Sequence, residues 1–310
     1  MHRERLELPD GDFLDLDWAG RATGPVVVIL HGLEGSSESN YVRGLLSAVT
    51  RRGWRGVVMH FRGCSGEPNR LAQCYTAGET RDIAHVVSVL HDREPGTPIA
   101  CVGYSLGGNA LLKWLGEVVE APPLRVAVGV SVPFLLAFAA QRLGRGLSRI
   151  YQAHLLRSLR SSYERKFQHL VSFPYPLDQV GGLGSFFEFD DRITAPLHGY
   201  SGVTEYYEHA SCRQYLVRIR VPTLIIHAAD DPFTSPQAIP AAAELSPSVT
   251  LEISKRGGHV GFVSGAKPWR PRYWLEQRIP DFLHAHFEST AMPNGLMATN
   301  RQEPEIMLNS

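Results

Sequence analysis

The sequence has no excess of charge of either sign, since its 310 residues include 31 basic and 31 acidic side chains. A protein that binds nucleic acid through general electrostatics needs a basic excess, so we predict no nucleic-acid partner. The longest uncharged apolar stretch, Val126–Ala140, is interrupted by Pro133. It is also shorter than the roughly 18 residues that a membrane-spanning helix needs. The sequence therefore predicts no transmembrane segment.

Cysteine is scarce, and the four cysteines form no C-x-x-C pair (Cys64, Cys74, Cys101 and Cys212). This spacing argues against a disulfide framework or a zinc knuckle, and it is typical of a reducing compartment. The first residues, Met1–Arg5, lead into no apolar segment of the kind found in secretory signal peptides. The sequence also has neither an H-E-x-x-H zinc motif nor a G-x-x-x-x-G-K-[ST] phosphate loop. We therefore predict a cytoplasmic protein with no cofactor and no metal ion.

Short β-rich segments alternate with longer segments of helical spacing, which is typical of a mostly parallel sheet covered by helices. Pro25–Leu30 is a continuous apolar run, as expected of a strand buried on both faces. By the same patterns we expect strands over Phe13–Trp18, Pro25–Leu30, Gly56–His60, Ile99–Gly103, Val126–Val130, Thr223–His227 and Val249–Ser254. We expect helices over Glu38–Arg52, Glu79–His91, Asn109–Val119 and Pro236–Leu245. The predicted fold class is α/β, with a central, mostly parallel sheet flanked by helices.

The alternation stops after Val132 and resumes near Cys212, and the sequence between them shows no convincing buried strand. We predict a mostly helical insertion over residues 134–212, between two parts of one core, residues 1–133 and 213–288. After Glu288 the sequence has no periodicity, so we expect a disordered tail over residues 289–310.

One motif, G-x-S-x-G, places Ser105 between a predicted strand and a predicted helix (Gly103–Gly107). The motif alone is weak, but this strand–turn–helix setting is what a nucleophile elbow requires. Small neighbours allow the strained turn and let a substrate approach the serine. We predict that Ser105 is a catalytic nucleophile; the alternative is a glycine-rich turn in which Ser105 caps the helix.

A carboxylate and a histidine follow Ser105 in the order that this architecture uses. Asp230 and Asp231 come directly after the predicted strand Thr223–His227, and His259 lies in a glycine-rich loop after the last predicted strand. The imidazole would take the proton of Ser105, and a carboxylate would orient the imidazole. The sequence favours Asp231 as this carboxylate and leaves Asp230 as the alternative.

Acyl transfer also needs hydrogen-bond donors directed at the developing oxyanion. The residue after the nucleophile, Leu106, offers one backbone N–H. The dipeptide His31-Gly32 follows the strand Pro25–Leu30, and the next residue, Leu33, is placed to offer the other N–H. We predict an oxyanion hole made by the N–H groups of Leu33 and Leu106.

Several longer motifs are specific to one branch of serine hydrolases. They are HGLEGSSESNYVR (31–43), FRGCSGEPNR (61–70), GYSLGGNALLKWLGE (103–117), FDDRITAPLHGY (189–200), AADDPF (228–233) and GGHVGF (257–262). Together they resemble the YheT-like esterases of the α/β-hydrolase superfamily, over nearly the whole chain up to about Glu288. The resemblance implies an α/β-hydrolase fold with a helical cap and hydrolysis of carboxylic esters. It also carries the catalytic triad over to Ser105, Asp231 and His259.

The predicted cap begins with a basic stretch, because residues 134–163 contain five arginines and no acidic residue (Arg142, Arg145, Arg149, Arg157 and Arg160). Leu143, Leu147, Ile150 and His154 recur at helical spacing. One interpretation is a basic amphipathic cap that makes peripheral contact with anionic lipid headgroups. The interpretation that we favour is a solvated helix whose arginines pair with acids such as Glu188, Asp190 and Asp191.

These observations predict a serine hydrolase that cleaves medium-chain, long-chain or lipid-like carboxylic esters through an acyl-enzyme, with a small-molecule ester as its partner. An acyltransferase would use the same residues and the same intermediate. A non-catalytic scaffold of this fold is a further alternative, but it should show an eroded elbow or triad, and every part is present in the sequence.

Overall fold

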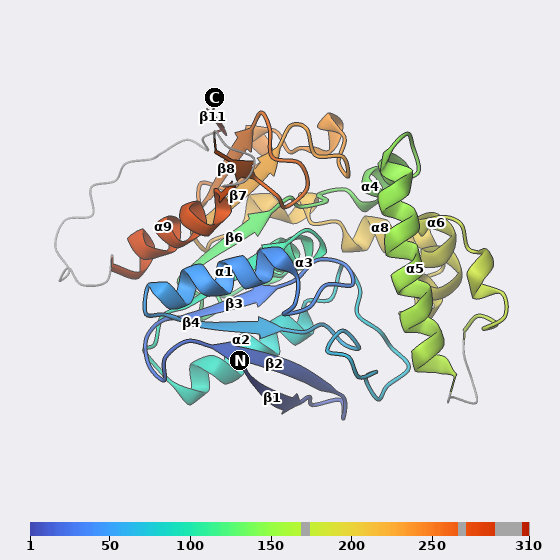
Figure 1. The fold of residues 1–310 in the computed structure, drawn as a ribbon, viewed down its shortest axis with the longest axis horizontal. Coiled ribbons are helices and arrows are strands. Elements are labelled where there is room, and N and C mark those ends of the chain that lie inside the picture. The colour runs from blue at the N-terminus through green and yellow to red at the C-terminus, as the bar shows by residue number, and fades with distance from the viewer. Residues whose placement is uncertain (169–173, 266–270, 289–305, 310) are drawn as a thin grey trace.

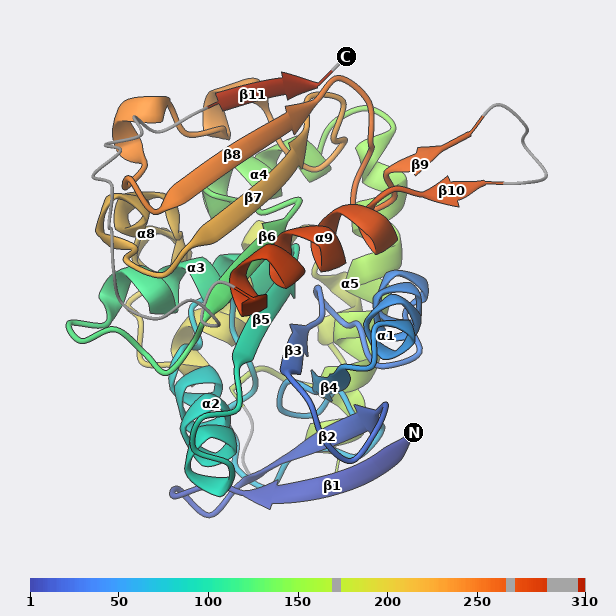
Figure 2. The same cartoon turned by 90° about the vertical axis from the view of Figure 1, so that its left-hand side faces the viewer.

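The computed structural model describes residues 1–168, 174–265, 271–288 and 306–309, and it places helices on both faces of a central sheet (Figures 1 and 2). The sheet contains β1 (His2–Glu7), β2 (Phe13–Ala19), β3 (Val26–Leu30), β4 (Arg55–Met59), β5 (Ile99–Tyr104), β6 (Val126–Val130), β7 (Thr223–Ala228), β8 (Val249–Ser254) and β11 (Ile306–Asn309). Their spatial order is β1-β2-β4-β3-β5-β6-β7-β8-β11. The β1–β2 and β2–β4 pairs are antiparallel, and all other neighbours from β4 to β11 are parallel.

The central strands are buried on both faces because helices cover both. Along β3, Val26 and Val28 join an apolar cluster with residues of α2 and α3, while Val27 and Ile29 join a second cluster with residues of α1 and α9. These four helices are α1 (Asn40–Arg51), α2 (Arg81–Arg93), α3 (Leu106–Glu117) and α9 (Leu275–Glu288). The period of two along each strand thus explains the continuous apolar runs in the sequence. The prediction of an α/β fold with a mostly parallel sheet is confirmed.

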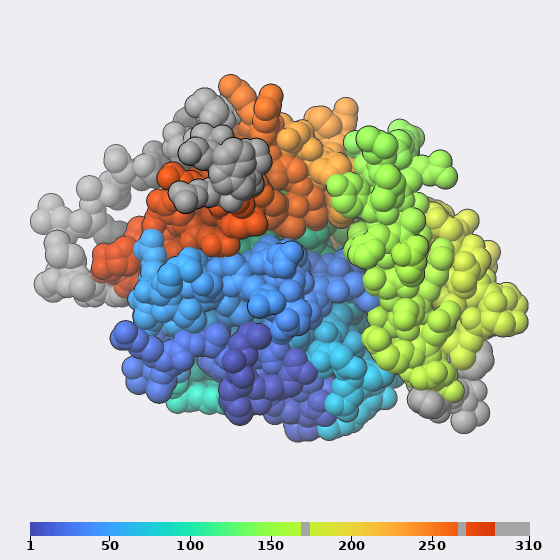
Figure 3. All heavy atoms as spheres, viewed as in Figure 1, coloured from blue at the N-terminus to red at the C-terminus, as the bar shows by residue number. Residues whose placement is uncertain are grey.

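Between β6 and β7 the described residues form helices and no strand. They are α4 (Leu136–Leu143), α5 (Ser148–Phe167), η1 (Val180–Gly182), α6 (Phe186–Phe189), η2 (Asp190–Thr194), α7 (Ala195–Leu197), α8 (Val203–Ala210) and η3 (Arg213–Arg218). We call residues 134–212 the helical segment. Figure 1 shows α4, α5 and α6 lying beyond the carboxyl ends of the parallel strands. In the space-filling view of Figure 3, this part of the chain, in green and yellow, covers the right-hand end of the molecule. Apolar side chains of α5, η1, α6 and η2 form a third cluster, whereas those of α8 join the first cluster of the sheet.

The basic stretch of the helical segment differs from the sequence prediction in two ways. Leu143 is the last residue of α4 and Leu147 is the residue before α5, so the two do not lie on one continuous helix; Gly146 between them has a left-handed conformation (φ 54°). None of the five arginines between residues 134 and 163 forms an ion pair with a carboxylate in the described residues. The favoured pairing with Glu188, Asp190 and Asp191 is therefore wrong.

Those three carboxylates accept hydrogen bonds within their own neighbourhood instead. Glu188 caps the start of α6, Asp190 accepts from Thr194 and Tyr207, and Asp191 accepts from the N–H of Val203.

The helix expected over Pro236–Leu245 is also wrong. The chain forms only two short 3₁₀ turns there, η4 (Pro236–Ala238) and η5 (Ala242–Glu244). Pro240 lies between them; it offers no N–H to a helix and disfavours helical geometry at the residue before it. Ile239 accordingly has an extended conformation (φ −71°, ψ 128°).

The chain beyond α9 lies mostly outside the described residues, and so does most of the predicted disordered tail over 289–310. At 306–309 the chain forms β11, which pairs with β8 in parallel, whereas the sequence had predicted no order there. Backbone pairing on an open sheet edge explains how a segment without periodicity can form a strand. A short hairpin, β9 (Val263–Ser264) and β10 (Arg272–Tyr273), completes the fold.

Candidate active site

Ser105 lies in the turn between β5 and α3, at the carboxyl end of the sheet. Its backbone is in a strained conformation (φ 50°, ψ −118°) that L residues rarely adopt. The turn is held on both sides, because the Ser105 N–H donates to Val130 O at 2.8 Å and the Asn109 N–H donates to Ser105 O at 3.0 Å. No side-chain cap hydrogen bond from Ser105 to α3 is present, so its hydroxyl is not used as a helix cap.

The glycines around Ser105 are required by close backbone approach. A Cβ on Gly103 would lie 2.5 Å from Gly107 O, and a Cβ on Gly107 would lie 2.5 Å from His31 O. Neither contact leaves room for a side chain, because both neighbouring atoms belong to the backbone. The glycines of the motif therefore allow β5, α3 and the end of β3 to meet beneath Ser105.

The structure brings Ser105, His259 and Asp231 into one hydrogen-bonded row. His259 Nε2 lies 2.9 Å from Ser105 Oγ, and His259 Nδ1 lies 2.9 Å from Asp231 Oδ2. Because a carboxylate only accepts, Nδ1 carries the proton and Nε2 is free to accept the Ser105 hydroxyl proton. The Asp231 side chain is almost fully buried, with 1% of its surface exposed, whereas that of His259 retains 13%.

Asp230 makes different contacts from its neighbour. Its Oδ1 accepts from the N–H groups of Gly257 and Gly258, both at 2.8 Å, so it holds the backbone of the loop that carries His259. Of the two adjacent carboxylates, Asp231 therefore contacts the imidazole of His259, and Asp230 contacts the backbone of the loop that carries it. Of the two candidates left open by the sequence, Asp231 is the one in contact with His259.

Two further residues fix His259, and the sequence analysis missed both. The ring of Phe233 stacks on the imidazole at 3.9 Å between centroids with an interplanar angle of 10°. Ser131 Oγ accepts from the N–H of Val260, the residue after His259, at 3.1 Å. Phe233 lies in the same turn as Asp231, so the AADDPF motif could have indicated that it lies close to His259. Ser131 follows β6 at a distant point in the chain, and no local pattern indicates its contact.

The two predicted oxyanion donors, Leu33 and Leu106, line the same pocket as Ser105 and His259. Leu106 is the first residue of α3, where a backbone N–H has no intrahelical acceptor. The N–H of Leu33 has no acceptor among the described residues. Both donors therefore remain available to a bound group.

His31 holds the peptide that precedes Leu33. Its Nε2 accepts from the Phe61 N–H at 3.2 Å, so Nδ1 carries the proton and donates to Gly32 O at 2.7 Å. Burial lowers the pKa of His31 to about 3, which keeps the ring neutral. In a trans peptide the C=O and N–H point in opposite directions, so holding Gly32 O directs the N–H of Leu33 to the other side.

The pocket beside Ser105 is lined mainly by apolar side chains of the helical segment. They come from α4, α5, α6 and η2, and include Leu143, Leu155, Leu159, Phe189 and Ile193. Some polar groups also line it. Among them is His198, whose buried Nε2 has no hydrogen-bond partner among the described residues and whose pKa is lowered to about 4 by burial.

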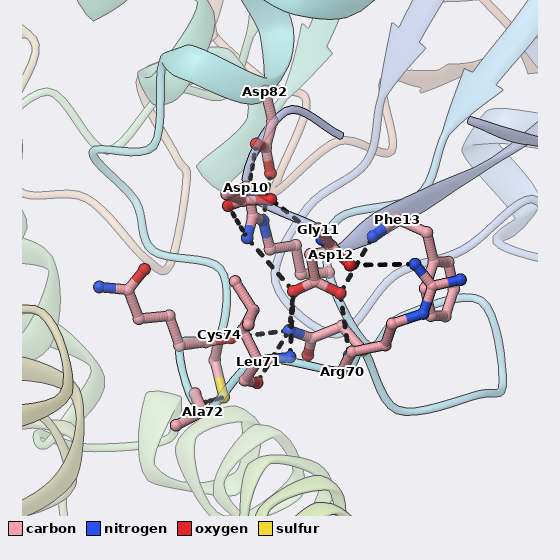
Figure 4. Close-up of polar contacts among 12 residues, drawn as sticks. Asp10, Gly11, Asp12, Phe13, Arg70, Leu71, Ala72, Cys74 and Asp82 are labelled. Carbon is pink, nitrogen blue, oxygen red and sulfur yellow. Dashed lines mark hydrogen bonds and ion pairs between the residues drawn. The ribbon is translucent and has the colours of Figure 1, made fainter. Parts of the chain in front are cut away.

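The loop after β4 forms another part of the pocket wall and is anchored by a network around Asp12 (Figure 4). Asp12 accepts from Asn69 Nδ2 at 2.6 Å and from the Arg70 N–H at 2.8 Å. Arg62 donates to Asp82, Asp10 and Asp12. On the other side of Asn69, its Oδ1 accepts from Lys166 Nζ of α5 at 2.6 Å. The network ties the pocket wall to both the core and α5.

Comparison with known proteins agrees with this architecture. A family model described as alpha/beta hydrolase fold matches residues 25–266. The chain is 45% identical over 291 residues to a protein of Escherichia coli named "Putative esterase YheT", covering 92% of this chain and 85% of that protein. It is 31% identical over 295 residues to a mouse protein named phospholipase ABHD3, covering 92% of this chain and 72% of that protein.

Among solved structures, the Pyrococcus furiosus esterase Pf2001 is similar in fold. The TM-score is 0.61 at 17% identity, over 92% of this chain and 90% of that chain. The predicted resemblance to YheT-like esterases and the predicted α/β-hydrolase fold are both confirmed. The esterase and phospholipase names of the relatives agree with the prediction of a carboxylic ester hydrolase. In the part of the chain that the structure describes, no helix is long and apolar enough to cross a membrane.

Proposed function

Because the chain belongs to the α/β-hydrolase fold family, we propose that it is a serine hydrolase that cleaves carboxylic esters with Ser105 as its nucleophile. The hydrogen-bonded row from Ser105 Oγ through His259 to Asp231 carries this proposal. It supplies a nucleophile, a base and a carboxylate that orients the base, which is the constellation that acyl transfer needs.

In the first half of the reaction, Ser105 Oγ attacks the ester carbonyl while its proton moves to His259 Nε2. The carbonyl oxygen becomes an oxyanion and accepts hydrogen bonds from the N–H groups of Leu33 and Leu106. The tetrahedral intermediate then collapses, the C–O bond to the alcohol breaks, and His259 gives its proton to the leaving alkoxide. Asp231 stabilises the imidazolium without taking its proton.

In the second half, water replaces the alcohol. His259 removes a proton from the water, whose oxygen attacks the acyl-enzyme, and the proton then passes to Ser105 as the carboxylic acid leaves. In each half His259 gives up the proton that it accepted in that half, and Ser105 regains its proton from water at the end, so the enzyme is restored without a cofactor.

The apolar lining from the helical segment supports a medium-chain, long-chain or lipid-like acyl group as the substrate's apolar part. We therefore assign the helical segment the role of a cap that covers Ser105 and forms the acyl pocket. The phospholipase name of the mouse relative supports a lipid-like ester.

The same cap would make peripheral contact with lipid. At the start of α5, Leu147 is 82% exposed and Ile150 is 68% exposed. Arg145 and Arg149, beside them in the sequence, are exposed as well. Apolar side chains flanked by cations without carboxylate partners fit an anionic bilayer surface. A cytoplasmic location is supported by the four cysteines, all of which are free thiols.

Labelling with a fluorophosphonate probe tests the proposed nucleophile. The parent protein should be labelled and should hydrolyse p-nitrophenyl esters, and Ser105→Ala should show neither activity. Ser88→Ala, which removes an exposed hydroxyl on α2, is the matched control and should behave as the parent. Labelling that persists in Ser105→Ala would contradict the assignment. Adding alcohol acceptors and measuring how the acyl group divides between acid and ester would reveal a transferase.

The lipid contact is tested by cosedimentation with vesicles. The parent should bind vesicles that contain phosphatidylglycerol, and the double variant Leu147→Glu/Ile150→Glu should not. Val217→Glu, on η3, places a charge at another exposed apolar position and should bind as the parent does. Equal binding by all three proteins would show that this surface does not contact lipid.

A further inference from the structure

Glu34, directly after the proposed oxyanion donor Leu33, has a backbone conformation that needs explanation. Its φ is 53°, in the left-handed region that is unfavourable for a residue with a side chain. Such a conformation persists only where surrounding contacts hold it, and it is enriched at functional sites. The contacts that hold Glu34 therefore indicate what the strained turn is for.

Glu34 forms a closed pair of hydrogen bonds with Tyr75. The Glu34 N–H donates to Tyr75 Oη at 2.9 Å, and the Tyr75 hydroxyl donates to Glu34 Oε1 at 2.8 Å. Burial raises the pKa of Tyr75 well above its usual value, so the hydroxyl keeps the proton that it donates. One hydroxyl group thus fixes both the backbone and the side chain of Glu34.

The second carboxylate oxygen of Glu34 connects the same turn to the helical segment. Ser162 Oγ, on α5, donates to Glu34 Oε2 at 2.6 Å. Each carboxylate oxygen therefore holds a hydrogen bond from a different part of the chain. Glu34 lines the pocket, but with both oxygens engaged it is not arranged as a second base.

Tyr75 is itself held firmly enough to act as an anchor. Its ring stacks on Phe61 at 5.4 Å between centroids with an interplanar angle of 17°. The segment before it is fixed as well, because Gln73 O accepts from Asn69 Nδ2 at 2.8 Å and from Lys166 Nζ at 2.9 Å. The Tyr75 hydroxyl, which is hydrogen-bonded to Glu34, is therefore fixed relative to both the sheet and α5.

The peptides on both sides of Leu33 are consequently held. Before it, Gly32 O accepts from His31 Nδ1 and from the Gly35 N–H, the latter at 3.0 Å. After it, the Glu34 N–H is bound to Tyr75. The direction of the Leu33 N–H depends on these peptides, and an oxyanion donor is effective only when it is already aligned with the developing charge.

We propose that Glu34 is a positioning residue that aligns the Leu33 N–H for the oxyanion, and that its bond to Ser162 makes this alignment depend on the docking of α5. The inference rests on the proposed function, because it concerns the same reaction. It adds a coupling between cap and catalysis: the oxyanion hole is complete only when the helix that forms the acyl pocket is in place.

Five variants and two readouts test the proposal. Glu34→Ala and Tyr75→Phe should lower kcat by about 10- to 100-fold, short of the loss of a whole oxyanion donor, while KM changes by less than about twofold. Glu34→Gly relieves the backbone strain and should lose activity as well, because it lacks the carboxylate. Glu34→Gln keeps an acceptor for Tyr75 and should recover most of kcat. Ser162→Ala should lower kcat by a smaller factor, about threefold.

The second readout is inhibition by an alkyl boronic acid, whose adduct with Ser105 places an oxygen where the oxyanion forms. Its affinity should fall by the same factor as kcat/KM across the series, whereas the thermal midpoint should not follow that order. Ser158→Ala is the matched control for Ser162→Ala, since among the described residues the Ser158 hydroxyl donates only to His154 O on the same helix. It should leave both readouts unchanged.

Two outcomes would overturn the proposal. Unchanged kcat in Glu34→Ala and Tyr75→Phe, in a protein that fluorophosphonate labels at Ser105, would show that the alignment does not need this pair. A rise in KM with constant kcat would show that Glu34 only contacts bound substrate. Absence of labelling and hydrolysis in the parent would instead count against the proposed function, so the two failures are distinguishable.

Discussion

The carboxyl edge of the sheet and the helical segment contribute to the site in different ways. Ser105, Asp231 and His259 lie within a few residues of the ends of β5, β7 and β8, so the chain connects each directly to a buried strand. The helical segment contributes none of the three. It supplies the apolar pocket wall and reaches the loops of Asp231 and Glu34 through side chains on α5, among them Ser148, whose Oγ donates to Pro232 O at 2.8 Å.

This difference indicates that the two regions control different properties. Atoms that follow buried parallel strands have little freedom, which suits groups whose hydrogen bonds must be aligned. The part of the helical segment around α5 and α6 has its own apolar cluster, whereas residues of α8 belong to a cluster of the sheet, so the α5–α6 part can change shape with less effect on the sheet. We therefore expect changes at the sheet edge to alter turnover or folding. Apart from Ser162, which contacts Glu34, changes in the helical segment should alter substrate selection and pH response.

The largest effect should come from the carboxylate that contacts the imidazole. Asp231→Asn should lower kcat by about 10⁴-fold, because an amide at this position favours the wrong tautomer of His259. Asp230→Asn, the matched change one residue away, should cost far less, since it weakens only the hydrogen bonds to the loop glycines. Steady-state kinetics of both variants would measure the two losses of kcat. A larger loss in Asp230→Asn than in Asp231→Asn would assign the orienting carboxylate to Asp230.

The next prediction compares the effect on stability of replacing one glycine at the sheet edge and one glycine in the helical segment. Gly107→Ala should lower the free energy of unfolding by about 3 kcal/mol, because its Cβ would meet backbone atoms that have no room to move. Gly181→Ala in η1 has open space around it and should change stability by no more than about 0.5 kcal/mol. Urea unfolding measures both, and equal stability of the two variants would contradict the difference in packing.

A third prediction concerns pH and the helical segment. The pKa of His198 is about 4 in the folded protein, below the value of about 6.5 in an unfolded chain. Between these values the unfolded state binds more protons, so the folded protein loses stability as the pH falls. His198→Phe removes this term and should be up to about 2 kcal/mol more stable than the parent at pH 5, with little difference at pH 8. A gain at pH 8 as large as that at pH 5 would refute the proton linkage.

The smallest effect should be one of selectivity. Leu155→Trp, in the pocket wall formed by α5, fills space that a long acyl chain would occupy. It should lower kcat/KM for a dodecanoyl ester relative to an acetyl ester by about tenfold. The kcat for the acetyl ester should change little, because Leu155 lines the pocket but takes no part in the hydrogen-bonded row. A proportional loss with every chain length would show that this region does not select the acyl group.

The sequence predicted the sheet and the row of three residues because both depend on local patterns. Buried parallel strands are continuous apolar runs, and each site residue follows such a run in a glycine-rich or acidic turn. Even the preference for Asp231 over Asp230 could be predicted from the sequence, because the AADDPF motif favoured Asp231.

Contacts between distant segments were not predictable in this way. Ser162 and Tyr75 contact Glu34 from points 128 and 41 residues away, and no periodicity encodes such a pairing. The first strand, β1, was missed because it lies at the sheet edge and carries charged residues at most positions. The helix expected over Pro236–Leu245 shows the opposite error, in which apolar spacing was given more weight than Pro240.

The position of α5 also bears on local opening of the protein. The helix touches the turn of Asp231 near its start, through Ser148, and Glu34 near its end, through Ser162, about 21 Å further along at 1.5 Å per residue. A fluctuation that lifts α5 breaks both contacts in one event. The Glu34 N–H donates to Tyr75 Oη, and the Phe233 N–H donates to Asp231 Oδ1. Although these two amides are far apart in sequence, we expect them to exchange with solvent as members of one cooperative unit with α5, with a shared opening free energy.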